Sequence, residues 1–526
     1  MFKIYISTAG IGSRLGKLTE YTNKCMVRIG NKPAISHIIE SYPENSNFVI
    51  GIGYKGTIVT DFLKIAYPDY NFEFANVDKF HGKGSSLLYS MFRAKDKLLC
   101  PFIFHAADTI ITQIPPSPEF KNWNAGYKTK DTTNYTSFNC SNNTIIRFNS
   151  KGSLDSDYSH IGLVGIKDFK LFWKISENYL KNNPDLNEAN DVTVLKEFIL
   201  EKKIEPFFPD NWFDIGNVLS LKSVRSKFKD SSFNVLEKPK ESIYLIKKNI
   251  IKFFADKNLS IKRAKRVEFL KGVVPGKVVL INNFYSYEYI DGQLLSEIND
   301  INVYSNFLKW SKNNLWKKVK SNNKIDKNKI ITKFYIDKTH ERVNNLHRIM
   351  NIKDEKNVIN GVRVPPLNDL LDLVDVNFLT ETELVTFHGD FILDNIIYNK
   401  KNDTYTAIDW RQDFGGNIES GDIYYDLAKQ MHNLTINHDI VDKNLFTIKK
   451  SENIIEVDIL RKNYLIDFEK IFIEFVKKHD YNLDKILILR SIIWLNMSPL
   501  HHSPFNLFLY YLGKLNLYKI LKKINQ

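Results

Sequence analysis

The chain carries the segment HGDFILDN at residues 388–395 and the segment IDW at residues 408–410, and this pair most constrains its fold. Residues 385–387, just before the first segment, predict the end of a strand. Residues 396–398 and 404–408 predict a hairpin, because aromatic and β-branched residues flank a polar turn. The hairpin would return the chain, so that the polar residues of both segments lie together at strand ends.

Three polar side chains in these segments have the spacing that phosphoryl transfer from ATP needs. Asp390 would accept the proton of a substrate hydroxyl, while Asn395 and Asp409 would hold Mg²⁺ against the phosphates. An ordinary hairpin with polar ends is the alternative, and these three positions alone do not exclude it. The catalytic interpretation is favoured because all three residues occur in the expected order and at the ends of predicted strands.

The same segment resembles the catalytic loop of the aminoglycoside phosphotransferase and choline kinase superfamily, which reads H-G-D-x-x-x-x-N before an I-D-W or I-D-F strand. The resemblance covers much of the C-terminal half and implies a two-lobed, protein-kinase-like α+β domain. It implies that Lys252 binds the α- and β-phosphates of ATP, with Glu268 as its carboxylate partner. Residues 284–292, which include Tyr287 and Tyr289, resemble the hinge that binds adenine.

Three further stretches bear on this comparison. Residues 260–270, which include Glu268, predict a helix. Residues 421–428, GDIYYDLA, resemble the helix start that follows the catalytic loop in the superfamily, where the aspartates brace the fold. Residues 236–242 form no glycine-rich loop, which departs from the phosphate cover of other kinases.

The N-terminus carries a second candidate nucleotide site. Residues 2–7 predict a short strand that runs into TAGIGSRL at residues 8–15, with Lys24 just downstream. Glycines let the backbone approach phosphates, N–H groups at a helix start bind anionic oxygens, and Arg14 and Lys24 add positive charge. A simple strand-to-helix turn is the alternative. The string is not a dinucleotide fingerprint, because the third glycine and the later acid are missing.

This string resembles the nucleotidyltransferase signature A-G-x-G-[ST]-R-L followed by P-K, with Asn23 in place of the usual proline. The resemblance implies a Rossmann-like α/β domain in which Arg14 and Lys24 are catalytic. Residues 81–86 fall where the family has a small-residue loop that contacts the base and ribose. The nucleotide-binding residues implied are Ala9, Gly10, Gly12, Ser13, Gly82 and Ser85.

Two acids are expected to bind Mg²⁺ in this domain. Asp108 ends a buried-looking strand, and Asp214 lies in WFDIG, which resembles the W-x-D-I-G segment of the nucleotidyltransferases. Two carboxylates on one Mg²⁺ make sense when a substrate phosphate attacks the α-phosphate and pyrophosphate leaves. Glu188 and Asp191 are candidate acceptor-site acids, although a solvated helix start is an equally good interpretation.

Length and composition are consistent with two enzymes in one chain. The 526 residues give a prior of about three domains, with two large ones equally acceptable. The three cysteines are far apart and odd in number, so they form no disulfide framework or zinc site and fit a reducing cytoplasm. With no apolar leader and no run long enough to span a bilayer, the sequence predicts a soluble cytoplasmic protein without membrane insertion.

The net charge of +14 could indicate a nucleic acid or an anionic membrane as partner. The lysines are scattered rather than gathered with stacking aromatics, for example at positions 317, 318, 320, 324, 327 and 329. Phosphorylated substrates account for the charge equally well, and no nucleic-acid partner is expected. The sequence predicts no particular oligomeric state.

The chain is expected to divide into a nucleotidyltransferase domain at residues 1–228 and a kinase domain at residues 229–526, with a linker near 227–232. A β-rich lobe is expected at 234–291. Strands are predicted at 48–53 and 71–76, and helices at 85–94, 191–202, 302–320, 329–350 and 366–378, with further helices to the C-terminus.

Together the two resemblances imply a bifunctional enzyme. The kinase would phosphorylate a small amino alcohol, choline or ethanolamine, and the N-terminal domain would join the product to a cytidylyl group from CTP. A phosphocholine cytidylyltransferase-like domain ahead of a choline kinase-like domain is a known bacterial arrangement for decorating surface glycans such as capsule or lipopolysaccharide, and this chain looks similar to it. CTP specificity rests on this resemblance alone.

Aromatic faces are the usual partners of a quaternary ammonium group. Candidates are Trp494, Tyr424 and Trp410 in the kinase domain and Trp123 and Tyr127 in the transferase domain, although such residues are more often part of a core. An alternative function is a sugar kinase joined to a sugar-1-phosphate nucleotidyltransferase. A binding protein that has lost catalysis is a third interpretation, and the full sets of candidate catalytic residues argue against it.

Overall fold

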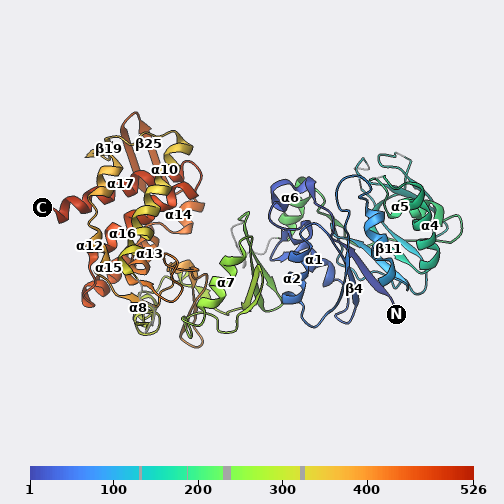
Figure 1. The fold of residues 1–526 in the computed structure, drawn as a ribbon, viewed down its shortest axis with the longest axis horizontal. Helices are drawn as coiled ribbons and strands as arrows, with labels where there is room; N and C mark the ends of the chain where they lie inside the picture. Colours follow the sequence, from blue (N-terminus) through green and yellow to red (C-terminus); the bar gives the residue numbers. More distant parts are fainter. Residues whose placement is uncertain (130–132, 154, 186, 229–237, 320–325) are drawn as a thin grey trace. The chain divides into compact units, whose positions relative to one another are not determined.

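The computed structural model describes residues 1–129, 133–153, 155–185, 187–228, 238–319 and 326–526, and Figure 1 shows their course from the N-terminus to the C-terminus. The predicted linker therefore lies mostly outside the described residues, as do residues 236 and 237 of the stretch expected to cover phosphates.

The chain divides into two compact units. The first consists of Met1–Ser260 with Val279–Tyr289, and the second consists of Ile261–Val278 with Ile290–Gln526. The predicted boundary at 228 and 229 thus lies inside the first unit, because the antiparallel sheet that follows it packs on the N-terminal part.

A sheet with a parallel centre forms the core of the first unit. Strand β1 (Lys3–Ser7) lies between β4 (Asn47–Ile52) and β6 (Phe102–Ala106), β5 (Asn71–Asn76) follows β4, and all these pairs are parallel. The first three strands are apolar and mostly buried on both faces, as parallel strands between helices must be. The expected strands at 48–53 and 71–76 are confirmed as β4 and β5.

Antiparallel strands extend this sheet beyond β6. β11 (Tyr158–Ile166) pairs with β6 and connects the sheet to its remaining members. These are β8 (Trp123–Tyr127), β9 (Ser137–Ser141), β10 (Thr144–Asn149) and β12 (Glu205–Phe207). A separate two-stranded pair, β7 (Thr109–Ile110) with β13 (Phe213–Asp214), joins the chain after β6 to a segment about a hundred residues later.

Helices cover both faces of the sheet, as in a doubly wound α/β fold (Figure 1). Ile4 and Ile6 of β1 pack on one face and Tyr5 on the other, following the two-residue period of a strand. The helices are α1 (Ala34–Ile39), α2 (Gly56–Ala66), α3 (Leu87–Phe92), α4 (Phe169–Asn182), α5 (Asp191–Phe198) and α6 (Val218–Lys227). α3 and α5 are shorter than the helices predicted at 85–94 and 191–202.

A second, antiparallel sheet also belongs to the first unit, in the order β14 (Glu241–Ile246), β15 (Asn249–Phe254), β17 (Phe284–Glu288) and β16 (Val279–Ile281). It confirms the β-rich character predicted for residues 234–291. Its apolar face packs on α2, where the Phe62 ring lies 5.5 Å from Tyr244 and 6.0 Å from Phe284. The Tyr244 hydroxyl donates to the Met26 carbonyl at 2.8 Å, which anchors this sheet to the N-terminal part.

The second unit is mainly helical, as predicted. Its longer helices are α8 (Ile301–Asn314), α10 (Lys338–Met350), α13 (Ile423–Thr435), α15 (Asn463–Lys478), α16 (Leu483–Met497) and α17 (Phe505–Ile524). Short helices are α9 (Lys327–Thr332), α11 (Leu367–Asp372), α12 (Val376–Thr380) and α14 (His438–Asp442). In the described residues, no helix is long and apolar enough to cross a membrane.

Small sheets interrupt these helices. The predicted hairpin is confirmed as β22 (Ile396–Asn399) with β23 (Thr404–Ala407), joined by β18 (Gln293–Leu294). β21 (Leu384–Val385) pairs with β24 (Gly421–Asp422). A further sheet contains β19 (Asn357–Ile359), β20 (Val362–Val364), β25 (Phe446–Ser451) and β26 (Ile454–Ile459), and its last two strands lie where only helices were expected.

Three predicted helices have different limits. The helix predicted at 302–320 ends at Asn314. The helix predicted at 366–378 is two short helices, α11 and α12. The helix predicted at 260–270 is α7 (Lys257–Arg266), which ends before Glu268.

Candidate active sites

The first candidate site lies where β1 ends and the chain turns into a short 3₁₀ helix, Ser13–Thr19. Gly12 has a φ of 71°, in the left-handed region that favours glycine. A Cβ atom on Gly12 would lie 2.7 Å from the Cβ of Lys24. The glycine therefore permits both the turn and the close approach of Lys24 to the loop.

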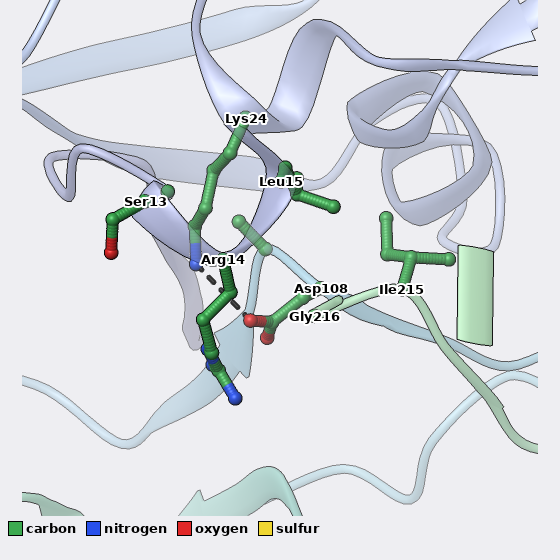
Figure 2. A pocket seen from close by; sticks show the side chains of 9 residues that line it. Ser13, Arg14, Leu15, Lys24, Asp108, Ile215 and Gly216 are labelled. Atoms are coloured by element: carbon green, nitrogen blue, oxygen red, sulfur yellow. Dashed lines mark hydrogen bonds and ion pairs between the residues drawn. The ribbon is translucent and has the colours of Figure 1, made fainter. Parts of the chain in front are cut away.

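Cationic and acidic side chains meet in a cavity of about 200 Å³ beside this loop. Lys24 Nζ lies 3.2 Å from Asp108 Oδ2, and Figure 2 shows Arg14 beside the same carboxylate. Burial raises the pKa of Asp108, but Lys24 and then Arg14 lower it, and the net effect is a lowered pKa. The lining residues are Gly12, Ser13, Arg14, Leu15, Lys24, Ala107, Asp108, Ile215 and Gly216.

The pairing of β13 with β7 brings Asp214 next to Ile215 and Gly216, which line this cavity. The backbone N–H of Ile215 donates to the Asp108 carbonyl at 3.0 Å. A Cβ atom added to Gly216 would lie 3.1 Å from Asp214 Oδ1, 3.5 Å from Asp108 Oδ2 and 3.5 Å from Arg14 Nη2. The two carboxylates and the guanidinium therefore surround one point.

This pair of carboxylates fits Mg²⁺. Mg²⁺ is commonly held by one or two protein carboxylates together with substrate phosphate oxygens. The described residues hold no group of three or more His, Cys, Asp and Glu side chains that could bind a metal alone. Substrate phosphates would therefore complete the coordination of an ion at Asp108 and Asp214.

Asn23, which replaces the usual proline before Lys24, holds the loop together. Its side chain is fully buried, and its Nδ2 donates to the carbonyls of Thr8 at 2.8 Å and Tyr54 at 2.7 Å. Its Oδ1 accepts the backbone N–H of Cys25 at 3.0 Å. Hydrogen bonds thus provide the rigidity that a proline would give, and they fix the start of Lys24.

Replacing Asn23 with alanine is expected to destabilise the first unit by about 1–3 kcal/mol, because buried backbone groups would lose their partners. Urea unfolding measures the effect. Asn182→Ala, at an exposed position of α4, is the matched control. Unchanged stability of Asn23→Ala would contradict this role.

Other residues predicted for the first unit lie outside the cavity lining. Ala9 is buried, and its carbonyl accepts the backbone N–H of Tyr54 at 2.9 Å. Gly10 follows it in the same loop. The Ser85 hydroxyl donates to the Gly82 carbonyl at 2.7 Å, which closes the turn before α3. Their nucleotide-binding roles stay predictions.

The candidate acceptor acids differ from each other. Asp191 is buried at the start of α5, and its carboxylate lies 2.9 Å from His160 Nε2. Glu188 is exposed. Trp123 is fully buried in the core, whereas Tyr127 is partly exposed and packs near Trp212.

The second candidate site is the loop that follows β21. His388 is fully buried, and burial lowers its pKa to about 4, so the ring is neutral at pH 7. Its Nε2 lies 2.9 Å from the Ile408 carbonyl, and its Nδ1 lies 3.3 Å from the backbone N–H of Asp390. Because a carbonyl only accepts, the ring proton is assigned to Nε2. His388 therefore ties the loop to the segment after β23 that carries Asp409.

Asp390 and Asn395 are in direct contact. The Asn395 amide donates to the Asp390 carbonyl at 2.8 Å and to its Oδ2 at 3.2 Å. On the other oxygen, Asp390 Oδ1 lies 2.7 Å from Lys429 Nζ. Burial raises the pKa of Asp390, but Lys429 and further groups, Arg411 among them, together lower it below its ordinary value, so the carboxylate is ionised at neutral pH.

Asp409 lies close to this pair. The backbone N–H of Ile408 donates to the Asn395 carbonyl at 2.8 Å, which joins the two segments. Asp409 has a φ of 61°, which is uncommon for a residue other than glycine and is typical of constrained functional positions. Asn395 and Asp409 offer amide and carboxylate oxygens, the ligand type that Mg²⁺ prefers.

Asp426 of α13 and Arg266 of α7 fix the backbone of this loop by hydrogen bonds. Asp426 accepts the backbone N–H groups of His388 and Gly389, both at 2.7 Å. This confirms the prediction that the aspartates of residues 421–428 brace the fold. The guanidinium of Arg266, also fully buried, donates to backbone carbonyls, those of Phe387, His388, Arg411 and Ile418.

Replacing Arg266 with methionine is expected to cost about 3 kcal/mol or more of stability, because several buried carbonyls would lose their donor. Denaturant unfolding of the full chain measures this loss. Arg348→Met removes the same charge from an exposed position of α10 and serves as the control. Equal unfolding midpoints for the two variants would contradict the role of Arg266.

The remaining predicted kinase residues belong to different units. Lys252 of β15 lies in the first unit, is 2% exposed, and has its Nζ 5.6 Å from the ring centre of Tyr287. Tyr289 of the same unit is 42% exposed. Glu268 belongs to the second unit, where it is exposed in the turn after α7. Their nucleotide-binding roles stay predictions.

The aromatic residues expected to hold an ammonium group are part of the core. Trp494 is 1% exposed, donates to His432 Nδ1 at 2.8 Å, and has the Arg490 guanidinium 4.6 Å from its ring. Trp410 is fully buried, and its Nε1 donates to a backbone carbonyl. Tyr424 is covered by Lys485, 4.6 Å from its ring centre. Cationic side chains of the protein therefore already cover the rings of Trp494 and Tyr424.

Lys429 is the main residue that the sequence reasoning missed. It lies on α13 three residues after Asp426, and Asn433 follows four residues later, so all three lie on one side of the helix. Asn433 Oδ1 accepts the backbone N–H of Leu393 at 2.9 Å. A polar stripe at helical spacing in an otherwise apolar helix was the available signal.

No family model matches the chain, and neither does any curated protein. The solved CTP:phosphocholine cytidylyltransferase from Streptococcus pneumoniae is 19% identical, with 43% of this chain and 99% of that chain covered and a TM-score of 0.36. A UDP-glucose pyrophosphorylase complexed with UDP-glucose is 18% identical, with 43% and 98% covered and a TM-score of 0.37. The inositol-1-phosphate CTP transferase from T. maritima is 15% identical, with 44% and 96% covered and a TM-score of 0.36.

Proposed function

We propose that the first unit transfers a nucleotidyl group from a nucleoside triphosphate to a phosphate-bearing substrate. The observation that carries this proposal is that Arg14, Asp108 and Asp214 come close to one point beside a glycine-containing loop, where Lys24 pairs with Asp108. A substrate phosphate oxygen would attack the α-phosphorus, the bond to the bridging oxygen would break, and pyrophosphate would leave.

Each side chain has a role in that reaction. Arg14 and Lys24 would bind the phosphate oxygens and stabilise the charge that develops on them. Asp108 and Asp214 would hold Mg²⁺, which when bound neutralises the α-phosphate. CTP is the proposed nucleotide, and this choice rests only on the resemblance of the chain to a phosphocholine cytidylyltransferase-like domain ahead of a choline kinase-like domain.

We also propose that the second unit phosphorylates a hydroxyl group with ATP. Support comes from the contact of Asp390 with Asn395 and from the adjacent, constrained Asp409. Asp390 would take the hydroxyl proton as the hydroxyl oxygen attacks the γ-phosphorus and ADP leaves. Asn395 and Asp409 would hold Mg²⁺, which shields the phosphate charge.

The two activities would form consecutive steps. The second unit makes a phosphate ester, and the first unit joins such a phosphate to a nucleotide. Choline or ethanolamine was expected as the acceptor from the resemblance of the two motifs, and the candidate aromatic residues Trp494, Trp410 and Tyr424 are buried. The proposal is therefore a bifunctional enzyme that acts on a small hydroxylated compound and yields a nucleotide-activated product in the cytoplasm.

The test is to incubate the purified full chain with ATP, CTP, Mg²⁺ and a panel of hydroxylated compounds and their phosphates, and to identify products by mass spectrometry. Pyrophosphate release with a supplied phosphate ester and ADP formation with its alcohol are expected. A nucleotide sugar as product would select the sugar pathway. Absence of pyrophosphate release with every phosphate and every nucleoside triphosphate would overturn the nucleotidyltransferase proposal.

A further inference from the structure

Cationic side chains from three separate parts of the second unit lie near one another, and one of them, Lys429, pairs with Asp390. Lys338 and Arg342 lie one turn apart on α10, Arg411 follows the strand that leads to Asp409, and Lys429 lies on α13. Lys338 Nζ is 4.1 Å from the ring centre of Phe334, and the Arg411 guanidinium is 5.1 Å from the same point. One aromatic ring therefore brings two of these cations together.

Arg411 is fixed against the catalytic loop. Its backbone N–H donates to the His388 carbonyl at 2.9 Å. A Cβ atom on Gly389 would lie 2.5 Å from the Cβ of Arg411, so only a glycine fits there. Arg411 thus connects the cations of α10 to the loop that carries Asp390.

The cations act on one another. Burial, and then the positive charges of Arg411, Arg342 and Lys429, together lower the pKa of Lys338 to about 6, while Asp413 opposes them. Burial and Arg411 likewise lower the pKa of Arg342. Like charges one turn apart on a helix are destabilising. This arrangement costs stability, which is typical of a binding site rather than of a structural element.

Two of the carboxylates near these cations are already engaged. Asp390 pairs with Lys429 at 2.7 Å, and Asp413 pairs with Lys262 at 2.8 Å. A third, Glu341, precedes Arg342 in the chain and raises its pKa. Positive charge is therefore in excess at this place. An anionic ligand would relieve the repulsion, whereas a cationic ligand would add to it.

The two carboxylate oxygens of Asp390 face different groups, and this indicates whether the cations lie near the nucleotide or near the acceptor. Its Oδ2 faces Asn395, the candidate ligand of the metal that binds ATP, and its Oδ1 faces Lys429. A general base must lie within hydrogen-bond reach of the hydroxyl whose proton it takes. Lys429 lies at the carboxylate oxygen that does not face Asn395, and Arg411 acts on the same carboxylate.

We propose that the acceptor of the second unit is a hydroxylated anion, a compound with a carboxylate or phosphate group that binds Lys338, Arg342 and Arg411 while its hydroxyl faces Asp390. This inference rests on the proposed kinase activity. The hydroxyl oxygen attacks the γ-phosphorus of ATP, its proton passes to Asp390, and ADP leaves. The product carries a new phosphate ester, which the first unit can use.

The test compares acceptors of different charge in the full chain. The panel contains glycerate, gluconate and glycerol 3-phosphate as anions, glycerol and glucose as neutral compounds, and choline and ethanolamine as cations. ADP formation measures turnover. Calorimetry with Asp390→Asn measures binding of the same compounds without turnover.

Two variants test the residues. Lys338→Gln and Arg342→Gln should each raise the KM of the anionic acceptor about tenfold or more, because each removes a charge-assisted contact. The KM of ATP should stay the same, which distinguishes an acceptor anion from the phosphates of ATP. Arg348→Gln, on the exposed side of the same helix, is the matched control.

Lys338→Gln should keep the melting temperature at pH 7, because a lysine with a pKa of about 6 is mostly neutral there in the free chain. This result separates a binding role from a structural one.

Each outcome either supports or overturns the inference of an anionic acceptor. Turnover of anions alone, with the KM changes above, supports the inference. Turnover of choline, ethanolamine or neutral compounds in preference to every anion overturns it and leaves the kinase proposal intact. Binding of anions without ADP formation by the unsubstituted chain supports an anion site and overturns the kinase proposal. Neither binding nor turnover of any anion overturns the inference. A raised KM for ATP in the variants assigns the cations to the nucleotide and likewise overturns it.

Discussion

Replacing Asp390 with asparagine should lower the rate of acceptor phosphorylation by about 10²- to 10⁴-fold, the contribution typical of a general base. Asparagine keeps the shape and the contact with Asn395 but cannot take a proton. The ion pair with Lys429 would also be lost. ADP formation measures this effect, and pyrophosphate release by the same sample should be unchanged.

Asp403→Asn is the matched control for this substitution, because Asp403 lies in the exposed turn of the β22–β23 hairpin. Its rate should equal that of the unsubstituted chain. If Asp390→Asn retained full kinase activity at an unchanged melting temperature, Asp390 would not be the base.

Replacing Lys24 with alanine should lower the rate of nucleotidyl transfer by about 10²- to 10³-fold, the usual cost of removing one group that stabilises developing charge. Lys24 contacts Asp108 and lines the cavity, so its loss removes a positive charge from the phosphate site. The pKa of Asp108 should rise as well, because Lys24 is the principal group that lowers it. Pyrophosphate release from CTP with a supplied phosphate ester measures the rate.

Lys64→Ala, at an exposed position of α2, controls for the loss of one lysine from the same unit. It should leave nucleotidyl transfer unchanged. Kinase activity should survive in both variants, since neither residue belongs to the second unit. Equal rates for Lys24→Ala and Lys64→Ala would show that Lys24 has no catalytic role.

The second candidate site could be predicted in detail wherever its residues are close in the chain. Asp390, Asn395 and Asp409 lie within twenty residues, and a strand, a loop and a hairpin suffice to bring them together. Local spacing sets this geometry, so a single sequence contains it. In the first unit, Arg14 and Lys24 could be predicted for the same reason.

Positions that depend on packing were harder to predict. Trp494 and Trp410 were candidates for an ammonium site, yet both are buried, because a lone aromatic residue in a sequence does not reveal which neighbours cover it. The role of Asn23 was also missed. Its hydrogen bonds reach Tyr54, thirty-one residues away, and no local pattern indicates such a contact.

The sequence by itself determined the two sets of catalytic candidates, since each motif is a short run whose strand-and-turn pattern fixes its own geometry. Only the tertiary structure decided the charge around Asp390. Lys338, Arg411 and Lys429 come from three segments up to ninety-one residues apart, and only the packing of α10 and α13 against the catalytic loop brings them together. Electrostatic interactions depend on distance in space rather than along the chain, so the anionic acceptor could be inferred only from the fold.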